Sequence, residues 1–443
     1  MKRYGIGTMA MASAGGYLAL LSTARTDSVV LLSIWAGLFV LYALLVYYQS
    51  EATFPLLLGA AVVFRLLGMG SLPTLSDDVY RFIWDGRLLA QGYNPYLYLP
   101  SEIITTEIAS QTGLTQALFQ KLNSPAYYSV YPPVLQLWFW LVATWSSTEA
   151  GAVFLLRVPL LAGELASLWL LYRLLRLAGR DDATVRRGVL LYALNPLVIV
   201  ELVANVHYEG LTICFLLACL YFYQTNKAYL SAASLGLAVG VKLLPLLFLP
   251  ALLIPTKPGK SIRYSLVTGL VVVVPFLFLF NSEVLARFST SLDLYFRRFE
   301  FNASVYYLLR SVGTWLVGYN PIGKLGPLLS VVSFSAILYL SFTRRFGITL
   351  YERLALVLTV YLLCTTTVHP WYVTPLVALG VLGRFRYPII WSALLPFTYL
   401  AYGQMPFQEN LWVVALEYLI VGRWLWWEVG EYAQRTGLEQ EVK

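Results

Sequence analysis

Polar residues that can perform acid–base and phosphate chemistry interrupt an otherwise apolar chain at a few places. In "SDDVYRFIWDGRLLAQGYNPY", Asp77 and Asp78 are adjacent, and Arg81, Asp85 and Arg87 follow closely. A carboxylate can take the proton of an acceptor hydroxyl, and an arginine can bind a phosphate. Asp78, Arg81 and Asp85 are spaced at i, i+3 and i+7, so they share one side of a predicted helix. Acidic residues also occur at helix starts for structural reasons alone, and both interpretations are open for this motif.

A second polar segment, "NPLVIVELVANVHYEG", lies within an apolar region. Glu201, Asn205 and Glu209 recur at every fourth position, which predicts a polar stripe along an apolar helix. His207 lies beside this stripe. A single histidine most often serves packing, but packing does not explain so many polar groups together, so we interpret the segment as functional.

Three shorter motifs add to these candidates. In "GLAVGVKLLPLL", Lys242 lies within a hydrophobic run, where it either extends to the membrane interface or binds a phosphate. In "TTTVHPWYVTPL", His369 adjoins Trp371 and Tyr372, whose structural interpretation is an aromatic belt. In "YPP", Tyr131 precedes a proline pair that is typical of a turn before a helix.

Together these residue types describe glycosyl transfer from a lipid phosphate. The departing phosphate needs positive charge in the transition state, and the acceptor hydroxyl needs a base, for which Asp77 or Asp78 is the candidate. A single base with direct displacement inverts the anomeric centre and requires no nucleophilic carboxylate. The cations that can serve the phosphate are Arg81, Arg87, Lys242 and His369.

The elements that must position these residues are predicted to be membrane helices. The chain has 443 residues, of which 59% are hydrophobic and 12% charged, with a mean hydropathy of +0.68; a soluble chain carries about 25% charged residues. We expect an all-α, polytopic membrane helical bundle of roughly 11 to 13 transmembrane helices, in a single domain over residues 1–443. Its net charge of +8 fits basic loops better than nucleic-acid binding, and three cysteines in apolar runs offer no zinc or disulfide pattern.

The basic loops predict the topology. Following the positive-inside rule, we place the N-terminus and the basic residues in the cytoplasm. Segment 71–128 then becomes an outer, periplasmic or lumenal loop with amphipathic juxtamembrane helices that carry the acidic motif, and the segments around His207 and His369 reach the same face. Two runs, 129–177 and 228–255, each fit one span or two. The basic loop residues are Lys2, Arg3, Arg173, Arg176, Arg180, Arg186, Arg187, Lys257, Lys260, Arg263, Arg344, Arg345, Arg384 and Arg386.

The serial order of these motifs resembles a known superfamily. "DDVYRFIWDGRLLAQGYNPY", "YPP", "NPLVIVELVANVHYEG", "VKLLP" and "HPWYVTPL" are similar in order and spacing to bacterial polyprenyl-phosphate-mannose-dependent α-mannosyltransferases of the GT-C superfamily. They are similar, more distantly, to the first mannosyltransferase of glycosylphosphatidylinositol synthesis. The resemblance extends over about residues 70 to 385. Related mannolipid enzymes often carry Asp-x-Asp, whereas this chain has adjacent aspartates.

The resemblance implies a GT-C fold and an inverting transferase for mannose. The donor would be a polyprenyl-phosphate sugar and the acceptor a lipid-linked sugar or a glycan. Because a lone pair of aspartates is weak evidence for a divalent cation, we expect no metal or other cofactor. Asp77 and Asp78 match the acidic motif, and we favour Asp78 as the base because it shares a helix face with Arg81. Lys242 and His369 would lie near the donor phosphate. Residues expected to bind the acceptor or sugar, or to support the base, are Glu209, His207, Asn205, Tyr131, Trp371 and Tyr372.

Two other functions compete with this hypothesis. A transporter or flippase of a lipid-linked substrate would need polar residues at the bilayer midplane and a repeated fold, but the charges gather at one predicted face and no repeat is evident. A non-catalytic assembly factor would leave the outward polar motifs without a role. We therefore favour the transferase, in the bacterial inner membrane rather than the endoplasmic reticulum, with its site on the periplasmic or lumenal face.

Overall fold

The computed structural model describes residues 3–254, 258–279, 281–297, 299–343, 347–404 and 406–441. Within these ranges the chain is helical, and its β pairing is one isolated bridge between Phe301 and Thr367. The all-α expectation is therefore confirmed. Lys2, Lys257, Arg344 and Arg345, which entered the topology prediction, lie outside the described residues.

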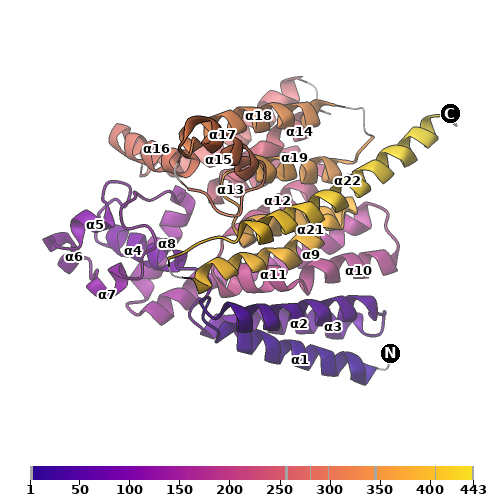
Figure 1. Cartoon of the computed structure of the whole chain (residues 1–443), viewed down its shortest axis with the longest axis horizontal. Helices are drawn as coiled ribbons and strands as arrows, with labels where there is room; N and C mark the ends of the chain where they lie inside the picture. The colour runs from indigo at the N-terminus through magenta and orange to yellow at the C-terminus, as the bar shows by residue number, and fades with distance from the viewer. Residues whose placement is uncertain are drawn as a thin grey trace.

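The N-terminal helices form one edge of the bundle (Figure 1). Helices α1 (Arg3–Leu21), α2 (Ser28–Tyr47) and α3 (Phe54–Leu67) pack against one another, and the short η1 (Gly68–Gly70) follows. The turn between α1 and α2 lies near the chain segment that leads into α4, because Arg25 reaches Asp77. This turn thus lies at the end of the bundle that carries the acidic motif.

A layer of short helices lies at that end of the molecule, on the left in Figure 1. It contains α4 (Asp78–Ala90), α5 (Pro100–Ile103), α6 (Glu107–Gln111), α7 (Gln116–Phe119) and α8 (Pro133–Trp145). Asp78 occupies the first turn of α4, and the Ser76 hydroxyl accepts its N–H at 3.3 Å. Unlike the predicted surface helix, α4 is buried on most sides. Gly86 permits this, because a Cβ there would lie 2.3 Å from the Phe139 carbonyl oxygen of α8.

The run 129–177 contains a single candidate span. Helix α8 stays beside α4, whereas α9 (Glu149–Leu177) is long and apolar enough to cross a membrane. The start of α9 is tied to the α4–α8 layer because Lys121 pairs with Glu149 at 2.6 Å. By length and composition, this run thus contains one helix that could cross a membrane.

The segment that carries Glu201, Asn205 and Glu209 is not one continuous helix. Helix α10 (Asp182–Ala193) is followed by α11 (Pro196–Val198) and the π-helical η2 (Ile199–Ala204), with a bend of 47° at the break, and α12 (Glu209–Gln224) starts a new helix. Val206 lies in the turn between η2 and α12 with φ of 62°, a conformation that costs free energy for a β-branched residue. The predicted stripe along a single helix is therefore wrong, because the chain turns between Asn205 and Glu209.

The run 228–255 is also broken. Helix α13 (Ala228–Val241) ends at Lys242, whose backbone is extended with φ of −150° and ψ of 133°. The short η3 (Leu244–Phe248) and α14 (Leu249–Leu253) follow. Because the break falls at Lys242, its side chain projects from the end of α13 and not from the middle of a helix.

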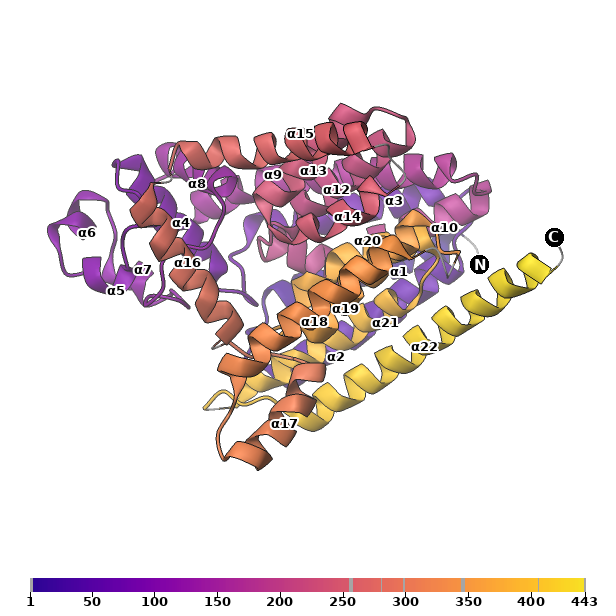
Figure 2. The same cartoon turned by 90° about the horizontal axis from the view of Figure 1, so that it is seen from above.

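The remaining helices complete the bundle. Helix α16 packs beside the α4–α8 layer through Val284 and Phe288 against Tyr96, and α22 runs along the edge of the molecule (Figure 2). In chain order, the remaining helices are α15 (Pro258–Leu277), α16 (Ser282–Arg297), α17 (Val305–Val317), α18 (Ile322–Phe342), α19 (Leu350–Cys364), η4 (Pro370–Val373), α20 (Thr374–Gly383), α21 (Tyr387–Leu394), η5 (Leu395–Gly403) and α22 (Leu411–Glu441).

The architecture is that of a helical membrane bundle. Among the described residues, four helices are long and apolar enough to cross a membrane, or five if the bent pair counts as one span, and six apolar segments are shorter. The sequence estimate of 11 to 13 spans counted apolar runs. Several of those runs fold as short or broken helices, so fewer meet the length required to span alone.

Candidate active site

Asp77 and Asp78, adjacent in sequence, have different surroundings. The Asp77 carboxylate pairs with Arg25 at 2.5 Å, and the Arg25 guanidinium lies 4.8 Å above the ring of Tyr402. The Asp78 carboxylate instead accepts one hydrogen bond, from Asn123 Nδ2 at 2.7 Å. Asp77 is thus neutralised by a partner, whereas Asp78 has no ion pair among the residues that the structure describes.

The environment of Asp78 favours a base. Burial raises the pKa of its carboxyl above the ordinary value, while the charge of His207 and the hydrogen bond from Asn123 lower it. The negative charge of Glu209 raises this pKa and Lys242 lowers it, which places both side chains within electrostatic reach. A carboxylate with a raised pKa binds a proton more readily, as a general base requires.

His207 lies in the turn after η2, within electrostatic reach of Asp78. Its Nδ1 lies 3.0 Å from the backbone oxygen of Glu201 and 3.2 Å from the Glu201 carboxylate, and Tyr399 donates its hydroxyl to that carboxylate at 2.7 Å. Both neighbours of Nδ1 are acceptors, so Nδ1 carries a proton. Nε2 is buried and has no hydrogen-bond partner among the described residues, so it is free to bond a ligand.

Lys242 lies between a carboxylate and an aromatic ring. Its ammonium pairs with Glu209 and lies 3.9 Å from the ring centroid of Tyr372. The Lys242 side chain is 31% exposed, whereas Glu209 is 6% exposed. The cation is therefore held in place by Glu209 and Tyr372 and remains accessible from one side.

A stack of rings connects three segments of the chain. The Trp371 indole lies between His207, at 3.7 Å between ring centroids, and His369, at 4.5 Å. Phe301 then stacks on His369 at 5.0 Å. Because imidazoles cover both faces of Trp371, the indole positions the two histidines and offers a ligand only its edge.

His369 is neutral in this arrangement. Burial, together with the positive charges of Lys242 and His207, lowers the pKa of His369 to about 3. A neutral imidazole donates one hydrogen bond. His369 can therefore bond a phosphate oxygen without carrying a charge of its own.

Buried polar side chains join the segment that leads into α4 to the segment around η2. The backbone N–H of Leu75 donates to Asn205 Oδ1 at 3.2 Å, which joins the approach to α4 to the turn after η2. Arg157 is fully buried and donates to carbonyls on both segments: Val203 at 3.0 Å, Met69 at 3.1 Å, and Ser71 and Ala204. Asn205 is thus a support for the site, and Arg157 is a support that the sequence interpretation missed.

Three predicted site residues have other partners. Arg81 pairs with Asp85 at 2.8 Å and donates to the carbonyls of Ser124 and Tyr127. Arg87 donates to the carbonyls of Gly113 at 2.7 Å and Ser147 at 3.1 Å. Tyr131 packs its ring against Phe82 at 4.8 Å. In these contacts the three residues stabilise the α4–α8 layer, and the structure does not bring them into the cluster around Asp78.

Arg25 and Asn123 were absent from the predicted site, and Glu201 was predicted only as part of the polar stripe, without a role of its own. Arg25 lies in "TARTDS" between two apolar runs. Two membrane crossings separate this turn from Asp77, which places both at the same face, so the sequence could have indicated Arg25. Asn123 lies in a loop whose fold over Asp78 has no local signal. Among the described residues, no group of three or more His, Cys, Asp or Glu side chains could hold a metal ion, and metal independence stays a prediction.

The fold and the cluster define a helical integral membrane protein with a polar site at one end of its bundle. The family model of the alpha-(1->6)-mannopyranosyltransferase N-terminal domain matches residues 3–256, which is more than half of the 443 residues. The chain belongs to this family. The match includes Asp78, His207, Glu209 and Lys242 and ends before His369.

A curated relative carries a related name. Alpha-(1->6)-mannopyranosyltransferase B of Corynebacterium glutamicum is 27% identical over 151 residues, which is 34% of this chain and 23% of the relative. The aligned region thus spans about a quarter of that relative's length. The family expected from the motifs is confirmed.

Proposed function

We propose that this protein is an inverting α-mannosyltransferase that moves mannose from a polyprenyl-phosphate donor to a lipid-linked or glycan acceptor. The observation that carries the proposal is the convergence of Asp78, Lys242 and His369 at one end of the bundle. The Lys242 cation lies there within electrostatic reach of the proton acceptor Asp78 and of the neutral hydrogen-bond donor His369. Membership in a family named for α-mannosyl transfer supports the sugar.

Asp78 takes the proton of the acceptor hydroxyl in the proposed reaction. The acceptor oxygen then attacks the anomeric carbon, a new carbon–oxygen bond forms, and the bond from that carbon to the phosphate oxygen breaks. The polyprenyl phosphate leaves with the bonding electron pair as an anion. Direct displacement inverts the anomeric centre, so an α-linked product requires a β-linked donor.

Lys242 and His369 stabilise the departing phosphate in this mechanism. The Lys242 ammonium exchanges part of its contact with Glu209 for a phosphate oxygen, and His369 donates its N–H. Positive charge aimed at the leaving group is worth several kcal/mol in a site that excludes water, of order 3 kcal/mol for one donor. The opening beside Lys242, where its side chain is 31% exposed, is the proposed position of the phosphate.

We place the site on the periplasmic or lumenal face of a bacterial inner membrane. The support is the positive-inside rule applied to the loops at the other end of the bundle. At that end, the start of α10 carries Arg186, which lies 3.9 Å from Glu51 of the α2–α3 turn.

The experiment is a transfer assay with purified protein in lipid vesicles. Radiolabelled polyprenyl-phosphate-mannose and the glucose analogue are offered with a membrane lipid extract as acceptor, with and without EDTA. We expect label from the mannose donor to enter the acceptor and EDTA to leave the rate unchanged. Folded protein that transfers sugar from neither donor would overturn the proposal and favour transport of a lipid-linked substrate.

A further inference from the structure

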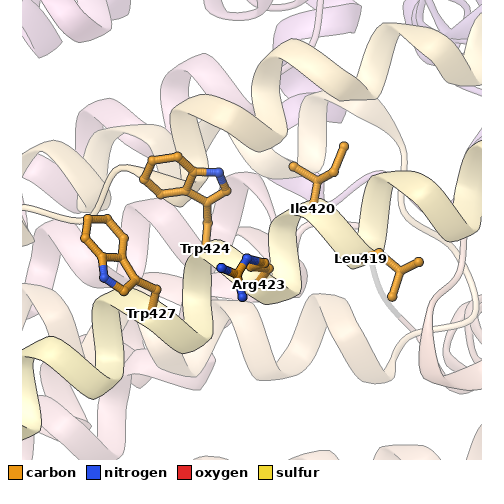
Figure 3. Close-up of a pocket in the computed structure, with 5 residues that line it drawn as sticks. All are labelled: Leu419, Ile420, Arg423, Trp424 and Trp427. Carbon is orange, nitrogen blue, oxygen red and sulfur yellow. The ribbon is translucent and has the colours of Figure 1, made fainter.

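A groove on the outside of α22 lies far from the candidate active site. Its volume is about 580 Å³, and its lining residues are Leu419, Ile420, Arg423, Trp424 and Trp427. Figure 3 shows these side chains along successive turns of α22, with the Arg423 guanidinium next to Trp424. The groove is therefore an apolar and aromatic surface with one cation in it.

Arg423 has no polar partner in the part of the chain that the structure describes. It is exposed, and the described residues give it neither a hydrogen bond nor an ion pair. The large side chains around it are also uncovered: Leu419 is 70% exposed and Trp426 is 83% exposed. An unpaired arginine beside lipid-facing side chains is costly unless an anion reaches it.

Hydrogen bonds of α22 show how deep Arg423 lies along the axis of the bundle. Glu428, five residues further along α22, accepts the backbone N–H groups of Arg386 at 2.9 Å and Tyr387 at 3.1 Å. These residues form the turn between α20 and α21, at the end of α20 opposite to His369. At about 1.5 Å per residue, Arg423 lies about 7.5 Å inside that turn, so its long side chain reaches the polar boundary of the bilayer.

We propose that this groove binds an anionic phospholipid, with its phosphate on Arg423 and an acyl chain along Leu419 and Ile420. Tryptophans favour the level of the headgroups, where Trp424 and Trp427 flank the cation. A second copy of the chain fits less well, because a two-fold contact through this face would bring two Arg423 guanidinium groups together. The proposal does not depend on the transferase function.

Lipid binding to purified protein in detergent tests this site. Native mass spectrometry measures the affinity of the first bound lipid, with dioleoylphosphatidylglycerol compared to dioleoylphosphatidylcholine. We expect wild type to prefer phosphatidylglycerol by about tenfold, as one charge-assisted contact gives. Arg423→Gln should abolish this preference, and Arg423→Lys should retain most of it.

Arg187→Gln is the matched control. Arg187 is exposed on α10, and its neighbour Gly188 packs toward Val381 near the end of α20. This variant removes one positive charge at the same end of the bundle but leaves the groove intact, so the lipid preference should persist. An unchanged preference in Arg423→Gln, an equal loss in Arg187→Gln, or a stable dimer that Arg423→Gln does not disrupt would each overturn the proposal.

Discussion

The start and the middle of α4 each carry an aspartate, yet the two carboxylates differ in how many bonding partners they have. In the middle, Asp85 binds Arg81 at 2.8 Å, Ser129 at 2.5 Å and Gln136 at 2.8 Å, and both charged side chains are buried. At the start, Asp78 accepts a single hydrogen bond, from Asn123. The difference teaches that a carboxylate in a membrane protein is a candidate for chemistry where its bonding capacity stays partly open.

The same contrast recurs between two ion pairs on the membrane helices. Arg65 and Glu164 are fully buried and form an ion pair at 2.9 Å. The Tyr192 hydroxyl donates a hydrogen bond to the Glu164 carboxylate at 2.7 Å. The pair of Lys242 and Glu209 is open on the lysine side. We therefore assign a structural role to the first pair and a ligand-binding role to the second.

The largest expected effect comes from Asp78→Asn. Removal of a general base lowers the rate by about 10²- to 10⁴-fold, and the amide keeps the shape and the contact with Asn123. We expect kcat to fall within this range while the melting temperature stays near that of wild type. Wild-type turnover in this variant would remove Asp78 as the base.

Asp85→Ala should instead act on stability. It leaves Arg81 buried without its carboxylate, which costs about 3 to 5 kcal/mol of the free energy of unfolding. Chemical denaturation in detergent measures this loss. The double variant Arg81→Met with Asp85→Ala serves as the control and should recover part of the loss, because the unpaired charge is gone.

Lys242→Gln tests the open ion pair. Loss of one charge-assisted contact of about 1.5 to 3 kcal/mol to the phosphate lowers kcat/KM by roughly ten- to a hundredfold. Steady-state transfer kinetics with varied donor concentration provide the measurement. The matched change in the closed pair, Arg65→Gln, should reduce the melting temperature, and the account fails if Lys242→Gln does the same with unchanged kcat/KM.

The pH dependence should follow Asp78. A protonated carboxyl accepts no proton, so transfer rises as pH increases through the pKa of Asp78, which lies above the ordinary value. Glu209 raises that pKa by its negative charge, so Glu209→Gln should move the acidic limb of the pH–rate profile to lower pH. A limb that stays in place or moves to higher pH contradicts this coupling.

The smallest effect is expected for Asp77→Asn. Its pair with Arg25 is about one-third exposed, with side chains at 32% and 28%, and such pairs contribute at most about 1 kcal/mol. Transfer should therefore fall by less than tenfold. A loss as large as that of Asp78→Asn would exchange the roles of the two aspartates.

Much of this arrangement follows from the sequence. Hydrophobic runs predicted an all-helical membrane bundle. The basic loops predicted that the segments around Asp78, His207 and His369 reach one face, and the order of the motifs, through the family resemblance, added Lys242 and Glu209. These signals are local patterns of residue type, which the chain carries regardless of how its helices pack.

The rest depends on tertiary packing that leaves no local pattern. The turn at Val206 uses a positive φ without a glycine, so the continuous stripe was the natural but wrong prediction. Arg81 shares a helix face with Asp78 by spacing, yet the fold of the loop around Ser124 and Tyr127 binds it elsewhere. The sequence indicates an open aromatic ring at Trp371, but in the fold the neighbouring His369 and the distant His207 both stack on it.

The most direct test of the contrast within α4 measures turnover and melting temperature on the same preparations of Asp78→Asn and Asp85→Ala. The account predicts that Asp78→Asn keeps its melting temperature and loses turnover, whereas Asp85→Ala melts earlier and retains turnover per folded molecule. If Asp78→Asn unfolds and Asp85→Ala abolishes transfer in folded protein, the roles assigned to the two parts of α4 are contradicted.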